Sequence, residues 1–126
     1  MNRQRYFEYK GYIGSIEYSR NNRYYHGKIL GLDIQIGYKS STIGTLKINF
    51  ESSVNQYLEN YKKEFLLFPE VPIRITVNVT EFMKHLGMYL DLAEKREIVF
   101  TRFQGERMEF YELRPINIED EDLLSF

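Results

Sequence analysis

The feature that most limits the fold is a change in hydrophobic period near residue 40. Between residues 12 and 38 apolar and polar residues alternate with a period of about two, which is typical of half-buried strands. From Ile43 to Tyr61 the apolar residues recur every three or four positions, which predicts one buried face of a helix. The first half of the chain should therefore form strands followed by a helix, and the fold class is expected to be α+β.

Turn-forming residues divide the alternating region into three predicted strands. Asn21-Asn22 tolerates the positive φ of a tight hairpin, and Gly31-Leu32-Asp33 interrupts the pattern again. Short connections of this kind join neighbouring antiparallel strands, so a meander is expected. The predicted strands are residues 12–19, 24–30 and 34–38.

The predicted helix begins soon after this meander. Ser40 or Ser41 is expected to cap it, because a hydroxyl there accepts a hydrogen bond from an unpaired amide. The helix should end between Asn60 and Lys63, and prolines at 69 and 72 place a domain boundary near residue 69. Its buried stripe is expected to contain Ile43, Leu46, Phe50, Val54, Tyr57, Leu58 and Tyr61.

The second half predicts a β-α-β-β unit. A strand over residues 73–77 should lead into a helix capped by Thr80. Two further strands, over residues 98–101 and 108–113, should be joined by a turn at Gln104-Gly105. The helix is expected to bury Phe82, Leu86, Tyr89, Leu90 and Ala93. The predicted organisation is a domain over residues 1–68, a second over 69–114 and an acidic tail over 115–126.

The composition gives few candidates for enzyme chemistry. The chain has no Cys and only two His, which are separated along the sequence and lack metal-ligand spacing. No glycine-rich loop is followed by the Lys and Ser or Thr of a phosphate site. We therefore expect no catalytic residue, metal or cofactor. The alternative, an active two-metal nuclease, would depend on Glu17 and Glu51, the acids placed on the first strand and the helix.

Charge is divided unevenly between the two halves. Residues 1–68 carry ten Lys or Arg against six Asp or Glu, whereas residues 69–126 carry seven against twelve. Such asymmetry indicates two units with different partners, two units that attract one another, or ordinary scatter over short segments. The absence of Cys and of a long apolar run predicts a cytoplasmic protein without a membrane span.

The first half resembles the N-terminal domain of HicB antitoxins over about residues 6–64. The resemblance rests on the segments 9–18 (YKGYIGSIEY), 25–32 (YHGKILGL) and the helix from Leu46 to Tyr61. It implies a degraded ribonuclease H-type β-β-β-α fold without catalytic acids. It also implies a partner, a HicA-like toxin that cleaves messenger RNA.

The second half resembles Phd/YefM antitoxins over about residues 73–114. The matching segments are 75–82 (ITVNVTEF), 86–93 and 98–102 (IVFTR). This resemblance implies a Phd-like β-α-β-β unit that forms a homodimer and binds operator DNA. DNA contacts are expected from four basic residues of this half, Arg74, Lys84, Arg102 and Arg107. The alternative for these four is a solvated charged surface.

Together the two resemblances imply a type II antitoxin that neutralises a toxin ribonuclease and represses its own operon. Acidic and aromatic residues suit a basic toxin, and the expected partner-binding residues are Glu17, Tyr24, Tyr25, Glu51, Glu119, Asp120, Glu121 and Asp122. The four tail acids could equally form a solubilising terminus. The alternative function is an orphan dimeric regulatory or interaction domain without a toxin partner.

Overall fold

The computed structural model describes residues 4–116, and the chain divides into two compact units. The first unit ends at Ile73 and the second begins at Arg74, so each is described by itself. Within the described residues eight strands form three sheets and three segments are helical, which confirms the α+β class. Among these residues no helix combines the length and the hydrophobicity that crossing a membrane requires.

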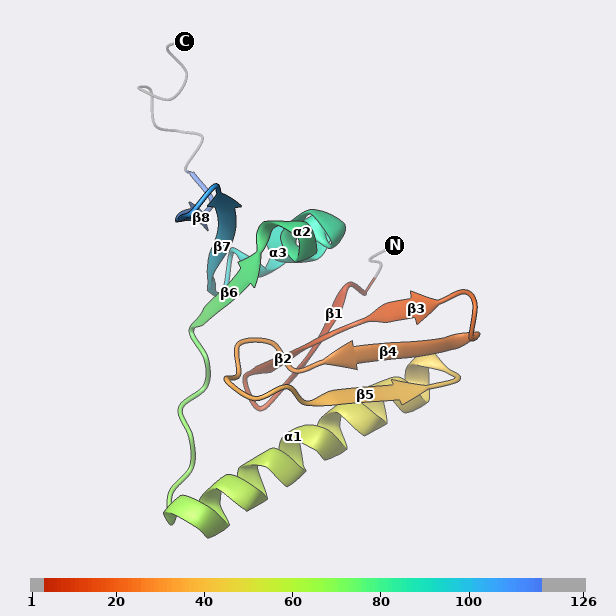
Figure 1. Cartoon of the computed structure of the whole chain (residues 1–126). Coiled ribbons are helices and arrows are strands. Elements are labelled where there is room, and N and C mark those ends of the chain that lie inside the picture. The colour runs from red at the N-terminus through yellow and green to blue at the C-terminus, as the bar shows by residue number, and fades with distance from the viewer. Residues whose placement is uncertain (1–3, 117–126) are drawn as a thin grey trace. The chain divides into compact units, whose positions relative to one another are not determined.

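The first unit is a curved antiparallel meander covered on one face by a long helix (Figure 1). Strand β1 pairs with β2, β3 pairs with β4 and β4 pairs with β5, all antiparallel. Helix α1 packs against β5, β4 and β1. In chain order the elements are β1 (Tyr6–Tyr9), β2 (Tyr12–Ser15), β3 (Glu17–Ser19), β4 (Tyr24–Lys28), β5 (Gly37–Ser40) and α1 (Ile43–Phe65).

The strand predicted over residues 12–19 is interrupted at Ile16, where β2 ends and β3 has not begun. Pairing with the neighbouring strand keeps one register across the gap, from Gly14 opposite Ile29 to Glu17 opposite His26. The interruption has a local cause, because the backbone N–H of Lys28 donates to the Ser15 hydroxyl at 2.9 Å. The Ser15 hydroxyl thus takes the place of a backbone acceptor for the Lys28 N–H, and the strand register is unchanged.

Two other strand predictions need correction. Strand β1 was not expected, and its hairpin to β2 turns at Lys10 and Gly11, which both have positive φ, 53° and 84°. The third strand of the meander is present, but its predicted range of 34–38 was too early: β5 occupies Gly37–Ser40 and residues 34 and 36 precede it in a loop. The loop is held by a hydrogen bond from the Ile29 N–H to the Ile36 carbonyl at 2.9 Å.

The N-cap of helix α1 lies one or two residues later than predicted, and the helix also ends later. Its N-cap is Thr42, whose hydroxyl accepts from the Thr45 N–H at 3.2 Å, and not Ser40 or Ser41. Its C-cap is Leu66, a left-handed residue whose N–H donates to the Lys62 carbonyl. The helix therefore continues through residues 61–65 and carries aromatic side chains beyond the core.

Replacing Thr42 by Ala should destabilise the first unit by about 1 kcal/mol, because the Thr45 amide loses its acceptor. Ser41→Ala is the matched control, since Ser41 is exposed and does not cap the helix; its effect should stay within about 0.5 kcal/mol. Urea unfolding followed by circular dichroism measures both. An equal loss in the two variants would contradict the assignment of the cap.

The core of the first unit lies between α1 and the strands. Leu46, Phe50 and Val54 are fully buried on α1, at the four-residue spacing that keeps them on one helix face. Phe50 stacks on Phe7 of β1 with ring centroids 5.6 Å apart and also contacts Tyr38 of β5 at 5.4 Å. The predicted stripe is thus confirmed at its centre, and Tyr57 and Leu58 are partly buried against the core. The expected burial of Ile43 was wrong, because its side chain is 43% exposed.

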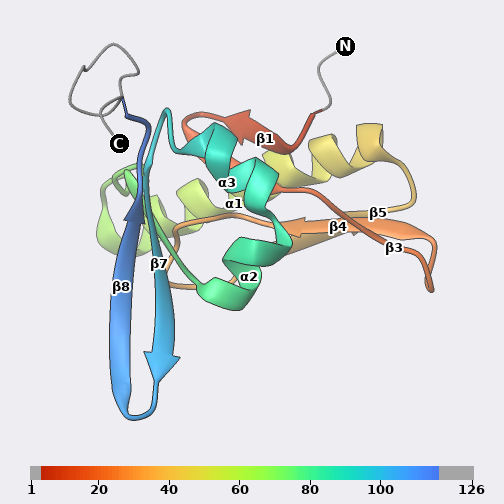
Figure 2. The same cartoon turned by 90° about the horizontal axis from the view of Figure 1, so that it is seen from above.

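The second unit is a three-stranded sheet with two short helices on one face (Figure 2). The strand order is β6-β7-β8; β6 and β7 are parallel, and β7 and β8 form a long antiparallel hairpin. The hairpin turns at Gly105, where φ is 66°, as the Gln104-Gly105 turn predicted. The elements are β6 (Arg74–Asn78), α2 (Val79–Lys84), α3 (Leu86–Leu92), β7 (Glu97–Gln104) and β8 (Arg107–Leu113).

The single helix predicted after Thr80 is two helices separated at His85. Asn78, and not Thr80, caps α2, because its side-chain oxygen accepts from the Glu81 N–H at 2.8 Å. The backbone of His85 is not helical, with φ −126°. The residues after His85 therefore turn a different side toward the core than they would in one continuous helix. Met88 and Leu92 are consequently buried, whereas the expected core residues Leu86 and Leu90 are 39% and 50% exposed.

The two faces of the second sheet differ in what covers them. On the helix side Phe82 of α2 stacks on Phe100 at 4.2 Å and 5°, and Phe100 stacks on Tyr111 at 5.1 Å. Phe103 pairs with Met108 and Thr101 with Phe110, and strand alternation places these pairs on the opposite face. Phe103 and Phe110 are 68% and 69% exposed there.

Candidate functional site

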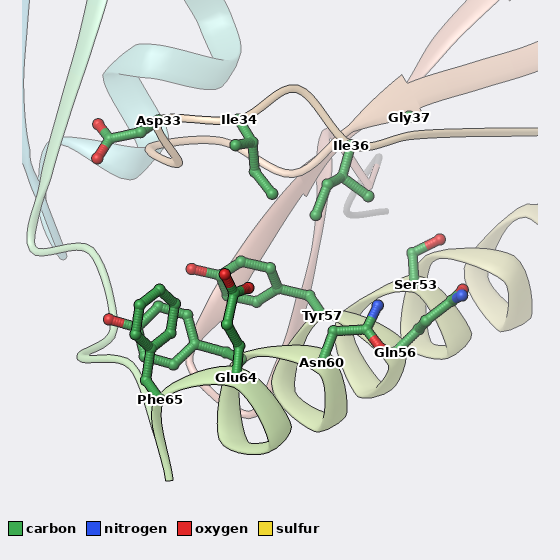
Figure 3. A pocket seen from close by; sticks show the side chains of 11 residues that line it. Asp33, Ile34, Ile36, Gly37, Ser53, Gln56, Tyr57, Asn60, Glu64 and Phe65 are labelled. Carbon is green, nitrogen blue, oxygen red and sulfur yellow. The ribbon is translucent and has the colours of Figure 1, made fainter. Parts of the chain in front are cut away.

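A pocket of about 600 Å³ opens in the first unit between the 33–37 loop and the C-terminal half of α1 (Figure 3). The loop forms one wall because β5 begins only at Gly37, and the helix forms the other because it continues to Phe65. The lining residues are Asp33, Ile34, Ile36, Gly37, Ser53, Gln56, Tyr57, Asn60, Tyr61, Glu64 and Phe65.

The helix wall is built from aromatic side chains. Tyr57, Tyr61 and Phe65 follow one another at four-residue intervals, so their rings lie along one side of α1. The ring centroids are 6.0 Å apart for Tyr57 and Tyr61 and 4.6 Å for Tyr61 and Phe65. Tyr12 of β2 packs edge-on against Tyr57 at 5.9 Å and supports the row from the core.

The loop wall contributes two isoleucines. Figure 3 shows the side chains of Ile34 and Ile36 pointing toward α1. Ile36 is partly buried and also packs against the core, whereas Ile34 is 57% exposed. An exposed aliphatic side chain opposite a row of aromatic rings is a surface suited to an apolar group from another molecule.

The polar lining is acidic. Asp33 and Glu64 are carboxylates, and Ser53, Gln56 and Asn60 add neutral hydrogen-bonding groups. None of the eleven lining residues, all within the described part of the chain, is Lys, Arg or His. The pocket lining therefore has two acidic side chains and no basic one, in a unit that is otherwise rich in basic residues.

The tyrosines beside the pocket are held in their neutral form. Burial raises the pKa of Tyr57, and the nearby charges of Tyr61 and Asp33 raise it further. Burial likewise raises the pKa of Tyr12, with added contributions from Tyr57 and Tyr61. These phenols are therefore hydrogen-bond donors and acceptors, and neither is poised to act as a base at neutral pH.

Two of the predicted partner-binding residues share one sheet face. Glu17 lies across from His26, with 3.9 Å between its carboxylate and the imidazole Nδ1. Tyr24 is on the same face of β4 and contacts the His26 ring at 5.7 Å. The ammonium group of Lys39 lies 5.7 Å from the centroid of the Tyr24 ring, so a basic group accompanies this aromatic surface.

The other predicted partner-binding residues lie elsewhere. Tyr25 is on the opposite face of β4 from Tyr24, packs against Tyr18 at 4.8 Å and borders the core. Glu51 is half-buried on α1, directly after Phe50. Neither residue lines the pocket. The four tail acids, Glu119, Asp120, Glu121 and Asp122, lie outside the described residues.

The four predicted DNA-binding residues are not gathered at one place. Arg74 forms an ion pair with Glu97 at 3.0 Å, near the start of β7. Arg102 lies further along β7, on the opposite face, and its Nη2 atom is 2.9 Å from both the Glu109 carboxylate and the Tyr111 hydroxyl. Glu109 accepts hydrogen bonds from Arg102 and from the Tyr111 hydroxyl, and these two bonds lower its pKa. Arg102 shares its sheet face with Arg107, and Lys84 ends α2.

The pocket residues were not selected from the sequence. Tyr57 and Tyr61 were assigned to the buried helix stripe, and Ile34 was assigned to a strand. One usable signal was present, since the aromatic four-residue spacing continues to Phe65 after the core positions have ended at Val54. The loop wall gave no such signal, because its position depends on where β5 begins.

Comparisons of the chain with protein-family models, curated proteins and solved structures find no match.

Proposed function

We propose that this protein is a type II antitoxin that binds and neutralises a small basic toxin ribonuclease of the HicA type. The proposal combines a HicB-like, degraded ribonuclease H-type first unit with a Phd/YefM-like second unit, and it places the protein in the cytoplasm. It is supported by the order of elements, a β-meander followed by a helix and then β-α-α-β-β. It assigns the protein a binding role without catalysis.

The observation that carries the proposal is the pocket beside α1. It offers aromatic and aliphatic contact area together with two carboxylates, and no basic side chain among its lining residues. Interfaces gain most of their affinity from a few aromatic and apolar anchors, while complementary charge selects the partner and speeds association. A basic RNA-binding toxin has the complementary chemistry.

Co-expression with the product of the neighbouring gene tests this function. A small basic neighbour that inhibits growth alone, is harmless with this chain and co-purifies through a tag on one partner would support an antitoxin. Addition of Mg²⁺ or Mn²⁺ and labelled RNA to the purified chain tests the nuclease alternative. Cleavage lost in Glu17→Ala and Glu51→Ala would replace the antitoxin proposal.

Operator binding would be the task of the second unit, and the ion pair at Arg102 allows a direct test. Glu109→Gln removes the carboxylate that holds Arg102, so affinity for upstream DNA should rise about twofold or more at low salt. Glu112→Gln is the matched control, because it removes the same charge from the opposite face of β8. Gel shifts over a salt series measure both. Equal gains in the two variants would exclude a specific role for Arg102.

The second candidate function is an orphan dimeric regulatory domain, and the uncovered face of the β6-β7-β8 sheet favours it. Phe103, Met108 and Phe110 are exposed together on that face. Apolar side chains gathered on a sheet face are typical of a surface that another molecule covers. A dimeric mass by light scattering, together with no retained neighbour protein, would favour this candidate over the antitoxin.

A further inference from the structure

We infer that the pocket beside α1 receives an arginine side chain from the partner protein, held between the Tyr57–Tyr61–Phe65 rings and the Asp33 and Glu64 carboxylates. This inference rests on the proposed function and specifies the chemistry of the partner at that site. The occupant is an arginine flanked by apolar residues, because a guanidinium group alone would leave the isoleucine wall without a contact.

The charge of the lining selects a cation. Glu64 points from the helix wall toward the loop, whereas Asp33 lies at the end of the loop wall with its carboxylate turned away from α1 (Figure 3). Asp33 is still near enough for its charge to raise the pKa of Tyr57. Aromatic rings attract cations through the negative charge of their faces, and this attraction adds to the carboxylates. No lining side chain offers a competing positive charge. An anion or a purely apolar group would leave both carboxylates without a counter-ion.

The shape of the lining favours arginine over lysine. A guanidinium group is planar and can stack on an aromatic ring while its five N–H donors reach acceptors in the same plane. The acceptors available are the two carboxylates and the side-chain oxygens of Gln56 and Asn60. A lysine ammonium group is compact, strongly hydrated and has only three donors, so it would use fewer of these groups.

A second observation concerns Tyr12, which lies behind the aromatic row. Its side chain is 2% exposed, and its hydroxyl is buried and makes no hydrogen bond within the described residues. Its ring packs edge-on against Tyr57, which lines the pocket. Buried hydroxyl groups are normally paired, so Tyr12 leaves one unsatisfied polar atom beside the aromatic row.

The test compares two ligands of similar shape that differ in charge and in one donor group. N-acetyl-arginine amide and N-acetyl-citrulline amide have planar end groups of the same shape, but the citrulline group is neutral. We expect the arginine probe to shift the methyl resonances of Ile34 and Ile36 with an affinity at least about tenfold higher than the citrulline probe. Equal affinities, or shifts confined to residues outside the pocket, would overturn the inference.

Variants then separate this inference from the antitoxin function. Asp33→Asn combined with Glu64→Gln should reduce binding of the arginine probe about tenfold and weaken retention of the co-expressed partner. Glu59→Gln is the control, an exposed acid on α1 that does not line the pocket. A partner retained equally by the wild type and the double variant would refute the arginine site and leave the antitoxin function in place. A chain that binds the arginine probe but retains no partner would refute the function itself.

Discussion

Gly27→Ala is expected to destabilise the first unit by about 3 kcal/mol or more, a large share of the stability of a small domain. Gly27 is buried in β4, and a Cβ atom there would collide with the backbone carbonyl oxygen of Ser15. It would also lie 2.8 Å from the ring and hydroxyl of Tyr38. That hydroxyl donates to the same Ser15 carbonyl at 2.8 Å, so the substitution must separate a bonded pair.

Gly44→Ala is the matched control for this prediction. Gly44 lies in the first turn of α1, and a Cβ atom added there meets nothing within 4 Å. Alanine restricts the unfolded chain and favours the helix, so this variant should be about 0.5 kcal/mol more stable than the wild type. Urea titration followed by the amide resonances of β4 and α1 measures both variants. Destabilisation of similar size in the two would contradict the close packing at Gly27.

Phe50→Ala should cost the first unit about 3–5 kcal/mol. Phe50 has no exposed surface and joins the helix to two strands through its contacts with Phe7 and Tyr38. Removal of the ring leaves a cavity bordered by rings from β1 and β5, and main-chain atoms cannot move far enough to fill it. The same urea titration should show a lower midpoint with a similar slope.

Phe65→Ala is the control that separates stability from binding. Phe65 lies on the same helix but is 52% exposed and lines the pocket. Its removal should change the unfolding free energy by no more than about 0.5 kcal/mol, yet it should weaken binding of the arginine probe. If Phe50→Ala were as mild as Phe65→Ala, the core would not be centred where the structure places it.

Local periodicity predicted much of the secondary structure. The spacing of Leu46, Phe50 and Val54 identified α1 and its buried face, because a helix this long must bury one stripe. The β7–β8 hairpin followed from alternating strands on either side of Gly105. These elements are predictable because their signals lie within a few neighbouring residues.

The sequence did not predict which residue caps α1 or where the helix of the second unit breaks. Three hydroxyl residues, at 40, 41 and 42, could each cap α1, and the structure uses Thr42. A helix that appears continuous in sequence breaks at His85, which exchanges Leu86 and Leu90 for Met88 and Leu92 in the core. Such choices depend on which arrangement packs best against the sheet, and sequence spacing does not contain that information.

The sequence by itself determined an α+β chain with a meander, a long amphipathic helix and the β7–β8 hairpin, because periodicity and turn residues act locally. Only the tertiary structure decided that β6 and β7 are parallel and that a pocket lies beside α1. Ile34 and Tyr57 are 23 positions apart in the sequence. They lie on opposite walls of the pocket because β5 starts, and α1 ends, later than the sequence pattern predicts. Binding sites built from residues distant in sequence depend on the packed fold, since no local pattern fixes where two elements meet.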